Sequence, residues 1–272
     1  MPHTKKITLG IIGAGTMGTA IANNIIRQKV LSRSQLIMSD KSRATLKQRK
    51  KQLHINVSDN NRAMVAQSDY IVLAVKPQDF TALADELSVQ APGKTIFLSI
   101  MAGVSIATLK KQLRTQRVVR AMPNLAAQIG QAFVVWKSAF AATAAEKKII
   151  GSVLDSMGTS VTVKTERDID KATAVSGSGP AYLYYIIELL IHSARSIGFT
   201  EVMARAMVEQ TIRGAWMVYE QGTATPAELR QQVASKGGTT AAALRTFQKN
   251  KLGQAITKGV RAAYDRAKEL SQ

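Results

Sequence analysis

The stretch from Ala174 to Tyr182 divides this chain into two different patterns. Before it, short apolar runs alternate with helical patterns, and after it the pattern is almost entirely helical. Within it, two serines and two glycines precede Pro180, and an apolar run continues to Ile191. Serine at an N-cap, proline in the first turn and apolar residues afterwards are typical of the start of a buried helix. The stretch therefore predicts a hinge between a cofactor half and a substrate or assembly half.

A glycine-rich turn follows the first apolar run, Ile7 to Ile12, and a helical pattern follows the turn. In this order of strand, turn and helix, the spacing G-x-G-x-x-G indicates a dinucleotide site. The first glycine allows a tight turn, the second lets the backbone approach the pyrophosphate, and the third lets the helix pack on the strand. The alternative is a tight turn without a ligand. The predicted cofactor contacts here are Gly13, Ala14, Gly15, Thr16, Met17 and Gly18.

The residues after the second predicted strand, Leu36 to Ser39, bear on the choice of cofactor. Asp40 stands where an acid normally holds the ribose hydroxyls of NAD and repels the 2′-phosphate of NADP. Lys41, Ser42 and Arg43 follow it and favour that phosphate. The two signals conflict, so the sequence leaves NADPH and NADH both open.

Further apolar runs complete a doubly wound parallel α/β sheet. The run from Tyr70 ends at Lys76 and Pro77, and the run from Thr95 ends near Ala102 and Gly103, where small residues would let a flat nicotinamide ring pack closely. Strand ends of this kind face bound ligands in open α/β sheets. The predicted strands span residues 7–12, 36–39, 70–75, 95–100, 117–121, 132–136 and 160–163.

The second half of the chain predicts helices only. The segment 180–197 is apolar nearly all round, which is typical of a helix buried on every side. A helical lobe of about 100 residues can hardly bury such a helix alone, so pairing of subunits is expected. We expect a dinucleotide-binding domain over 1–167 and a helical dimerisation and substrate domain over 168–272. The predicted helices span residues 168–175, 180–197, 201–221, 226–234, 239–248 and 252–270.

A small-residue loop, Ser235 to Thr240, interrupts the helical half. Two glycines and two threonines at a helix start predict a backbone-amide site for a small anion, most simply a carboxylate, and Lys236 adds positive charge. A plain helix–helix turn with a threonine cap is the alternative.

Composition limits the remaining possibilities. The 272 residues include no cysteine, which excludes thiolate metal sites and cysteine nucleophiles. Without an apolar leader or membrane-length run, the chain is expected to be soluble and cytoplasmic. The net charge of +19 is sharpest over 41–51, with six bases and no acid, but no aromatic residues alternate with the bases. We therefore expect a solvated helix face, and no membrane or nucleic-acid partner.

Taken together and in this order, five further motifs accompany the glycine turn. They are Ala74-Val-Lys-Pro77, Ser99-Ile-Met-Ala-Gly-Val104, Arg120-Ala-Met-Pro-Asn124, Ser176-Gly-Ser-Gly-Pro-Ala-Tyr182 and Val233-Ala-Ser-Lys-Gly-Gly-Thr-Thr240. With them the chain closely resembles the pyrroline-5-carboxylate reductase family over essentially its whole length. The resemblance implies hydride transfer from NADPH or NADH to the C=N bond of L-1-pyrroline-5-carboxylate, which gives L-proline in the last step of proline synthesis.

The resemblance also implies a dimer, with an active site between the nicotinamide and the helical lobe. It implies that Asn61, Ala74, Val75, Lys76 and Pro77 contact the cofactor. It implies that the substrate carboxylate is held by the loop at Gly237, Gly238, Thr239 and Thr240, beside Lys236. Ser176 would lie nearby, and Thr240 is the candidate proton donor. The reaction requires no metal, and none is predicted.

Three positions depart from the family pattern, namely Leu125-Ala126 in place of Thr-Pro, Lys236 before the glycines, and Asp40. None removes a group that the reaction needs. Two alternatives stay open, another cyclic-imine or β-hydroxyacid-type reductase and a dinucleotide-binding relative that has lost catalysis. The hydroxyacid class needs a lysine just beyond the glycines of the hinge, where this chain has Ala181 to Tyr185. The ring size of the imine and the oligomer beyond a dimer are also left open.

Overall fold

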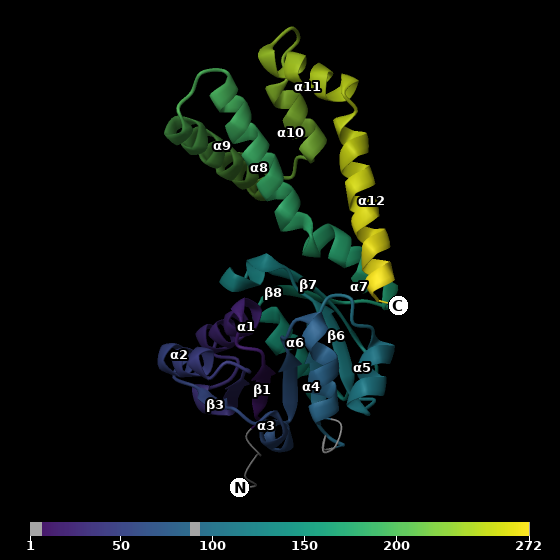
Figure 1. The fold of residues 1–272 in the computed structure, drawn as a ribbon. Helices are drawn as coiled ribbons and strands as arrows, with labels where there is room; N and C mark the ends of the chain where they lie inside the picture. Colours follow the sequence, from purple (N-terminus) through teal and green to yellow (C-terminus); the bar gives the residue numbers. More distant parts are fainter. Residues whose placement is uncertain (1–6, 88–92, 272) are drawn as a thin grey trace. The chain divides into compact units, whose positions relative to one another are not determined.

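The structure is a computed structural model that describes residues 7–87 and 93–271. These residues form two compact units (Figure 1). The first comprises the described residues up to Ser178 together with 263–271, and the second is Gly179–Ala262. The last turns of the chain thus belong to the same unit as the first strands.

The described part of the first unit contains an eight-stranded sheet in the order β3-β2-β1-β4-β5-β6-β7-β8. The order 3-2-1-4-5-6 is that of doubly wound dinucleotide-binding sheets, in which the strand order reverses between the parallel strands β1 and β4. The predicted strands all form, with shifted ends. The bounds are β1 (Leu9–Ile12), β2 (Leu36–Ser39), β3 (Asn56–Ser58), β4 (Tyr70–Leu73), β5 (Ile96–Ser99), β6 (Val118–Met122), β7 (Ala132–Ser138) and β8 (Gly158–Thr162).

Two features of the sheet differ from the prediction. Strand β7 runs antiparallel to β6, with Val119 opposite Ser138, so the sheet is not parallel throughout. The connection 123–131 holds only the short 3₁₀ helix η3 (Leu125–Ile129), whereas a parallel crossover needs a dozen or more residues. Strand β3 was not predicted, because it has three residues and no buried apolar run.

Helices cover both faces of this sheet (Figure 1). On one face, Ile21 and Ile25 of α1 share a core with Ile11 and Met38, and α2 and α6 add further side chains. On the other face, Leu109 of α5 shares a second core with side chains of α3, α4 and the sheet. The bounds are α1 (Thr16–Arg27), α2 (Arg43–Leu53), α3 (Asn61–Gln67), α4 (Phe80–Leu87), α5 (Ile106–Leu113) and α6 (Ala144–Asp155).

A buried guanidinium joins β6 to α7 (Arg167–Ala172) and to the end of α12 (Leu252–Leu270). Arg120 is 2% exposed; its Nη1 lies 2.6 Å from Glu166 Oε1 and its Nη2 lies 2.8 Å from Asp170 Oδ1. Nη2 also donates to Ser271 Oγ, which in turn donates to Asp170. Glu166 Oε1 accepts the backbone N–H of Ile106 as well. One side chain thus holds four separate segments of the first unit together.

The second unit consists of helices, as predicted. They are α8 (Gly179–Ser196), α9 (Glu201–Gln221), α10 (Pro226–Val233), α11 (Thr239–Lys249) and most of α12. The expectation that 180–197 is buried on all sides fails within one chain, because no residue of α8 is buried. Leu183 is 62% exposed and Trp216 on α9 is 59% exposed. A single chain therefore leaves much of the apolar surface of this unit uncovered. Among the described residues, no helix combines the length and apolar character that crossing a bilayer requires.

We predict that Arg120→Met lowers the free energy of unfolding by about 3–5 kcal/mol, because it leaves the carboxylates of Glu166 and Asp170 without their buried partner. Urea unfolding monitored by circular dichroism measures the loss. The matched control is Arg266→Met, which breaks an exposed ion pair with Glu269 and should cost at most about 0.5 kcal/mol. Equal losses in the two variants would contradict the structural role of Arg120.

Candidate active site

The three motif glycines are required for different reasons. Gly13 has φ of +106° and donates its N–H to Ser39 O, and a Cβ there would lie 2.5 Å from Ala74 O. A Cβ on Gly18 would overlap the carbonyl oxygen of Gly13. A Cβ on Gly15, in contrast, would meet no atom of the chain within 4 Å. The fold therefore demands the first and third glycines, and the second leaves the open space that a dinucleotide needs for close approach.

The start of α1 offers free backbone donors beside that space. Gly15 is the N-cap residue and provides no side-chain cap. The first intrahelical bond runs from Thr19 N–H to Gly15 O, so the amides of Thr16, Met17 and Gly18 precede it and have no helical acceptor. Such amides and the helix dipole together favour a phosphate. These residues fit a dinucleotide pyrophosphate.

The carboxylate of Asp40 connects two loops at the same edge of the sheet. Its Oδ2 accepts Ala14 N–H at 2.8 Å, and its Oδ1 accepts Ser42 N–H at 2.9 Å. Both oxygens thus already hold backbone amides. The neighbouring cations are exposed, with Lys41 3.3 Å from a carboxylate oxygen of Asp79 and Arg43 similarly paired to Asp59.

The next predicted cofactor residues gather at the carboxyl ends of β1, β2 and β4. Asn61, the first residue of α3, accepts Ser39 Oγ–H at 2.6 Å and donates to Glu86. The N–H of Ala74 donates to Ile12 O, which places the segment Ala74 to Pro77 directly beside the glycine turn. The structure therefore brings Asn61, the glycine turn and this segment to one edge of the sheet.

Gly103 is constrained by packing within the first unit. Its φ is +72°, and a Cβ there would lie 2.8 Å from Leu270 Cβ at the end of α12. Its small size is thus needed for the chain end to dock. Contact of Ala102 and Gly103 with the nicotinamide stays a prediction.

Ser176 lies in a feature that the sequence analysis missed. Residues Thr173–Gly177 form a π-helical turn between α7 and α8, and such turns are frequent at functional sites. Asn124, which follows β6, donates from Nδ2 to Ser176 O at 3.1 Å and lies 3.4 Å from Ser176 Oγ. One feature of the sequence could have indicated this contact. Pro180 has no N–H, so the Ser176 carbonyl cannot accept the hydrogen bond that residue 180 would donate in an α-helix.

The predicted carboxylate loop lies in the second unit, where it forms one tight turn. Gly237 has φ of +76°, and Gly238 N–H donates to Ser235 O at 3.0 Å. Gly238 is the N-cap residue of α11 without a side-chain cap, and the first intrahelical bond goes from Ala242 N–H to Gly238 O. The amides of Thr239 and Thr240 therefore precede the helical ladder and are available to an anion.

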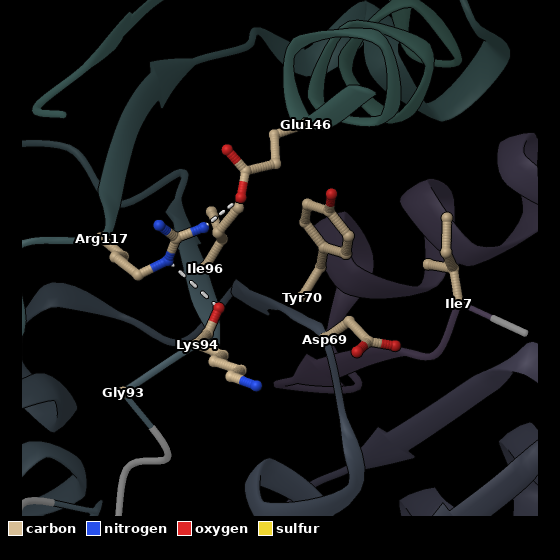
Figure 2. Close-up of a pocket in the computed structure, with 8 residues that line it drawn as sticks. All are labelled: Ile7, Asp69, Tyr70, Gly93, Lys94, Ile96, Arg117 and Glu146. Carbon is tan, nitrogen blue, oxygen red and sulfur yellow. Dashed lines mark hydrogen bonds and ion pairs between the residues drawn. The ribbon is translucent and has the colours of Figure 1, made fainter. Parts of the chain in front are cut away.

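A cavity of about 400 Å³ occurs at the opposite edge of the sheet, where β4 and β5 begin. Figure 2 shows Arg117 in it, donating to Glu146 and to the carbonyl of Lys94. Burial raises the pKa of the Tyr70 hydroxyl above its ordinary value. Because ligands of open α/β sheets bind at the carboxyl ends of strands, this cavity is not the cofactor site.

Two family models match the chain. Residues 8–103 match the family described as "NADP oxidoreductase coenzyme F420-dependent", and residues 166–270 match "Pyrroline-5-carboxylate reductase dimerisation". With the glycine turn and the sheet order, these matches define an NAD(P)-dependent oxidoreductase with an NADP-binding domain and a dimerisation domain.

Relatives match the chain over nearly its full length. A pyrroline-5-carboxylate reductase from Staphylococcus saprophyticus is 30% identical over 95% of this chain and 96% of its own. A solved pyrroline-5-carboxylate reductase from Coxiella burnetii is 29% identical, covers 98% of this chain and 100% of its own, and has a TM-score of 0.88. The pyrroline carboxylate reductase of Plasmodium falciparum, solved with NADP bound, is 28% identical at a TM-score of 0.87, with 98% and 99% covered. The chain belongs to the pyrroline-5-carboxylate reductase family.

Proposed function

We propose that this protein reduces the C=N bond of L-1-pyrroline-5-carboxylate to give L-proline. The observation that carries the proposal is the pair of uncapped helix starts in a chain of this family. One, at Gly15, has open space and free amides for a pyrophosphate, and the other, at Gly238, has free amides for a carboxylate. A dinucleotide and a small carboxylic acid are the two reactants that this reaction requires.

The chain's own residues bind and orient the reactants. The first-turn amides of α1 hold the pyrophosphate, and Asn61 with the segment Ala74 to Pro77 borders the rest of the dinucleotide. The bound nicotinamide supplies the hydride. Rate acceleration arises mainly from placing the imine carbon about 3–3.5 Å from the hydride donor. Orientation is therefore the principal task of both helix starts.

The start of α11 binds the substrate carboxylate and provides a proton donor for the imine nitrogen. The amides of Thr239 and Thr240 donate to the carboxylate, while Lys236 adds a charge at the edge of the loop. A nicotinamide bound in the first unit would supply a hydride to the imine carbon, and the π electrons of the C=N bond would then move to nitrogen. The hydroxyl of Thr240, or a water bound beside it, delivers the proton to that nitrogen. We propose that Ser176 contacts the same nitrogen through its hydroxyl oxygen.

We also propose that NADPH is the preferred cofactor. The two carboxylate oxygens of Asp40 already accept the backbone N–H groups of Ala14 and Ser42. These two donors partly offset the negative charge that would otherwise repel a 2′-phosphate. Lys41 and Arg43 are exposed beside it and can leave their weak ion pairs for a 2′-phosphate. The NADP-bound relative supports the same choice.

The reaction is tested by following absorbance at 340 nm with L-1-pyrroline-5-carboxylate and either NADPH or NADH. We expect rapid oxidation with at least about a tenfold preference for NADPH, since a charge-assisted phosphate contact contributes about 1.5–3 kcal/mol. In Arg43→Ala the preference should fall, with NADH turnover unchanged. Cofactor binding without oxidation would instead favour a relative that has lost catalysis, and turnover of a six-membered cyclic imine acid alone would reassign the substrate.

The two helix starts are tested separately by a reciprocal pair of variants. Gly15→Val should fold normally, because a Cβ at this position meets no atom of the chain within 4 Å, yet lose cofactor binding. Thr240→Val should bind cofactor normally and lower kcat by about 10²-fold, as loss of a positioned proton donor does. Fluorescence titration with NADPH and steady-state rates distinguish the two. Normal cofactor affinity in the first variant, or normal turnover in the second, would remove that residue from the site.

We further propose that the functional unit is a homodimer paired through the helical unit. The exposed side chains of Leu183, Tyr185 and Trp216 are too apolar to face water together, and the dimerisation match covers them. Light scattering should give twice the 29.4 kDa chain mass, or a multiple of that pair. Leu183→Glu should lower the mass toward one chain, and a single-chain mass for the unaltered protein would contradict the pairing.

A further inference from the structure

The carboxamide of Asn124 has one orientation that satisfies its surroundings. Its Oδ1 accepts the backbone N–H of Ala126 at 3.1 Å, as an N-cap does, and this directs Nδ2 toward Ser176. A flipped amide would place a donor against the Ala126 N–H and an acceptor against the Ser176 carbonyl. The hydrogen-bond pattern therefore determines which end of the carboxamide faces the π-helical turn.

The π-helical turn leaves the Ser176 carbonyl in need of a donor. Ser178 N–H donates to Thr173 O at 2.8 Å, the five-residue step of a π-helix. In an α-helix the Ser176 carbonyl would accept from residue 180, but Pro180 has no N–H. The Nδ2 of Asn124 donates to that carbonyl at 3.1 Å. Asn124, the N-cap residue of η3, thus supplies the bond that the proline removed.

The same contacts determine in which direction the Ser176 hydroxyl donates its proton and from which side it accepts a hydrogen bond. Ser176 Oγ lies 3.4 Å from Asn124 Nδ2 and 3.2 Å from the carbonyl oxygen of Phe133. An amide nitrogen only donates and a carbonyl oxygen only accepts, so the hydroxyl proton goes to Phe133. Ser176 is half-buried, and its Oγ has a remaining lone pair for a further partner. It can accept a hydrogen bond from a ligand but has no proton free to donate.

We propose that Asn124 is a positioning residue of the reductase, which holds Ser176 Oγ as an acceptor for the N–H of the protonated imine. The role rests on the proposed function, because it needs the imine nitrogen near Ser176. The protonated imine has an N–H to donate and the neutral imine has none. The arrangement therefore selects the protonated form, to which hydride adds more readily, and leaves any proton delivery to Thr240 or water.

The test is Asn124→Asp, in which a carboxylate oxygen retains the N-cap but the amide donor is lost. The serine hydroxyl then turns to donate to the new carboxylate, and its lone pair no longer faces the ligand. We expect kcat/KM for the imine to fall by about 10–100-fold, with the NADPH dissociation constant within about twofold of normal. The alkaline limb of the kcat–pH profile is followed in Asn124→Ser, which keeps a capping oxygen without a charge that would itself hold the proton on the imine. This limb should move to lower pH, because the bound imine loses its hydrogen-bond acceptor.

Three further variants make the result decisive. Asn60→Asp is the matched control, because Asn60 caps α3 through its Oδ1 in the same way. Its Nδ2 donates no hydrogen bond to the described residues, so the change to aspartate breaks none there. It should leave kcat, KM and the pH profile unchanged. Ser176→Ala should reproduce the shifted alkaline limb, and the double variant with Asn124→Ser should shift it no further.

The outcomes separate this inference from the proposed function. An unmoved alkaline limb in Asn124→Ser, with Ser176→Ala impaired, would overturn the role of Asn124 alone. The activity of the Asn124 variants could also fall only as far as the fraction of protein that still binds NADPH falls. Asn124 would then have a purely structural role, and the inference would be overturned. Normal kinetics in Ser176→Ala would remove Ser176 from the proposed site, and with it this inference, while turnover of pyrroline-5-carboxylate would still support the reductase.

Discussion

The buried Arg120 guanidinium is the interaction on which the arrangement of the first unit depends. A charge that is 2% exposed must be paired, and its partners come from α7 and from the residue after α12. The same strand, β6, leads four residues later to Asn124 and its contact with Ser176. The ion pairs therefore fix the positions of β6, α7 and the chain end relative to one another, and the contact between Asn124 and Ser176 depends on those positions.

The cofactor edge shows how one motif serves both folding and binding. Gly13 and Gly18 are small because neighbouring backbone lies against them, whereas Gly15 is small although nothing in the chain approaches it. Asp40 has a similar double character, because a position associated with ribose binding here holds the amides of two loops. Residue type at a motif position therefore identifies the site, while the contacts decide which residues are free to meet a ligand.

The helical unit differs from the first unit, because its own core is too small to bury its apolar residues. Leu183 and Trp216 are more than half exposed in a single chain, and the family match over 166–270 is to a dimerisation domain. Burial that a chain cannot supply to itself must come from another surface. The long apolar helix after the hinge thus has its explanation in assembly.

The sequence by itself determined what is local or periodic. Glycine spacing, Pro180 and the apolar runs predicted the dinucleotide turn, the hinge, seven of the eight described strands and the helices of the second unit, because each depends on residues a few positions apart. Only the tertiary structure decided the antiparallel direction of β7, the pairing of Arg120 with Glu166 and Asp170, and the contact between Asn124 and Ser176. These partners are 46 to 52 residues apart, and a buried hydrogen bond over that separation depends on how the whole chain packs. No local pattern records that packing.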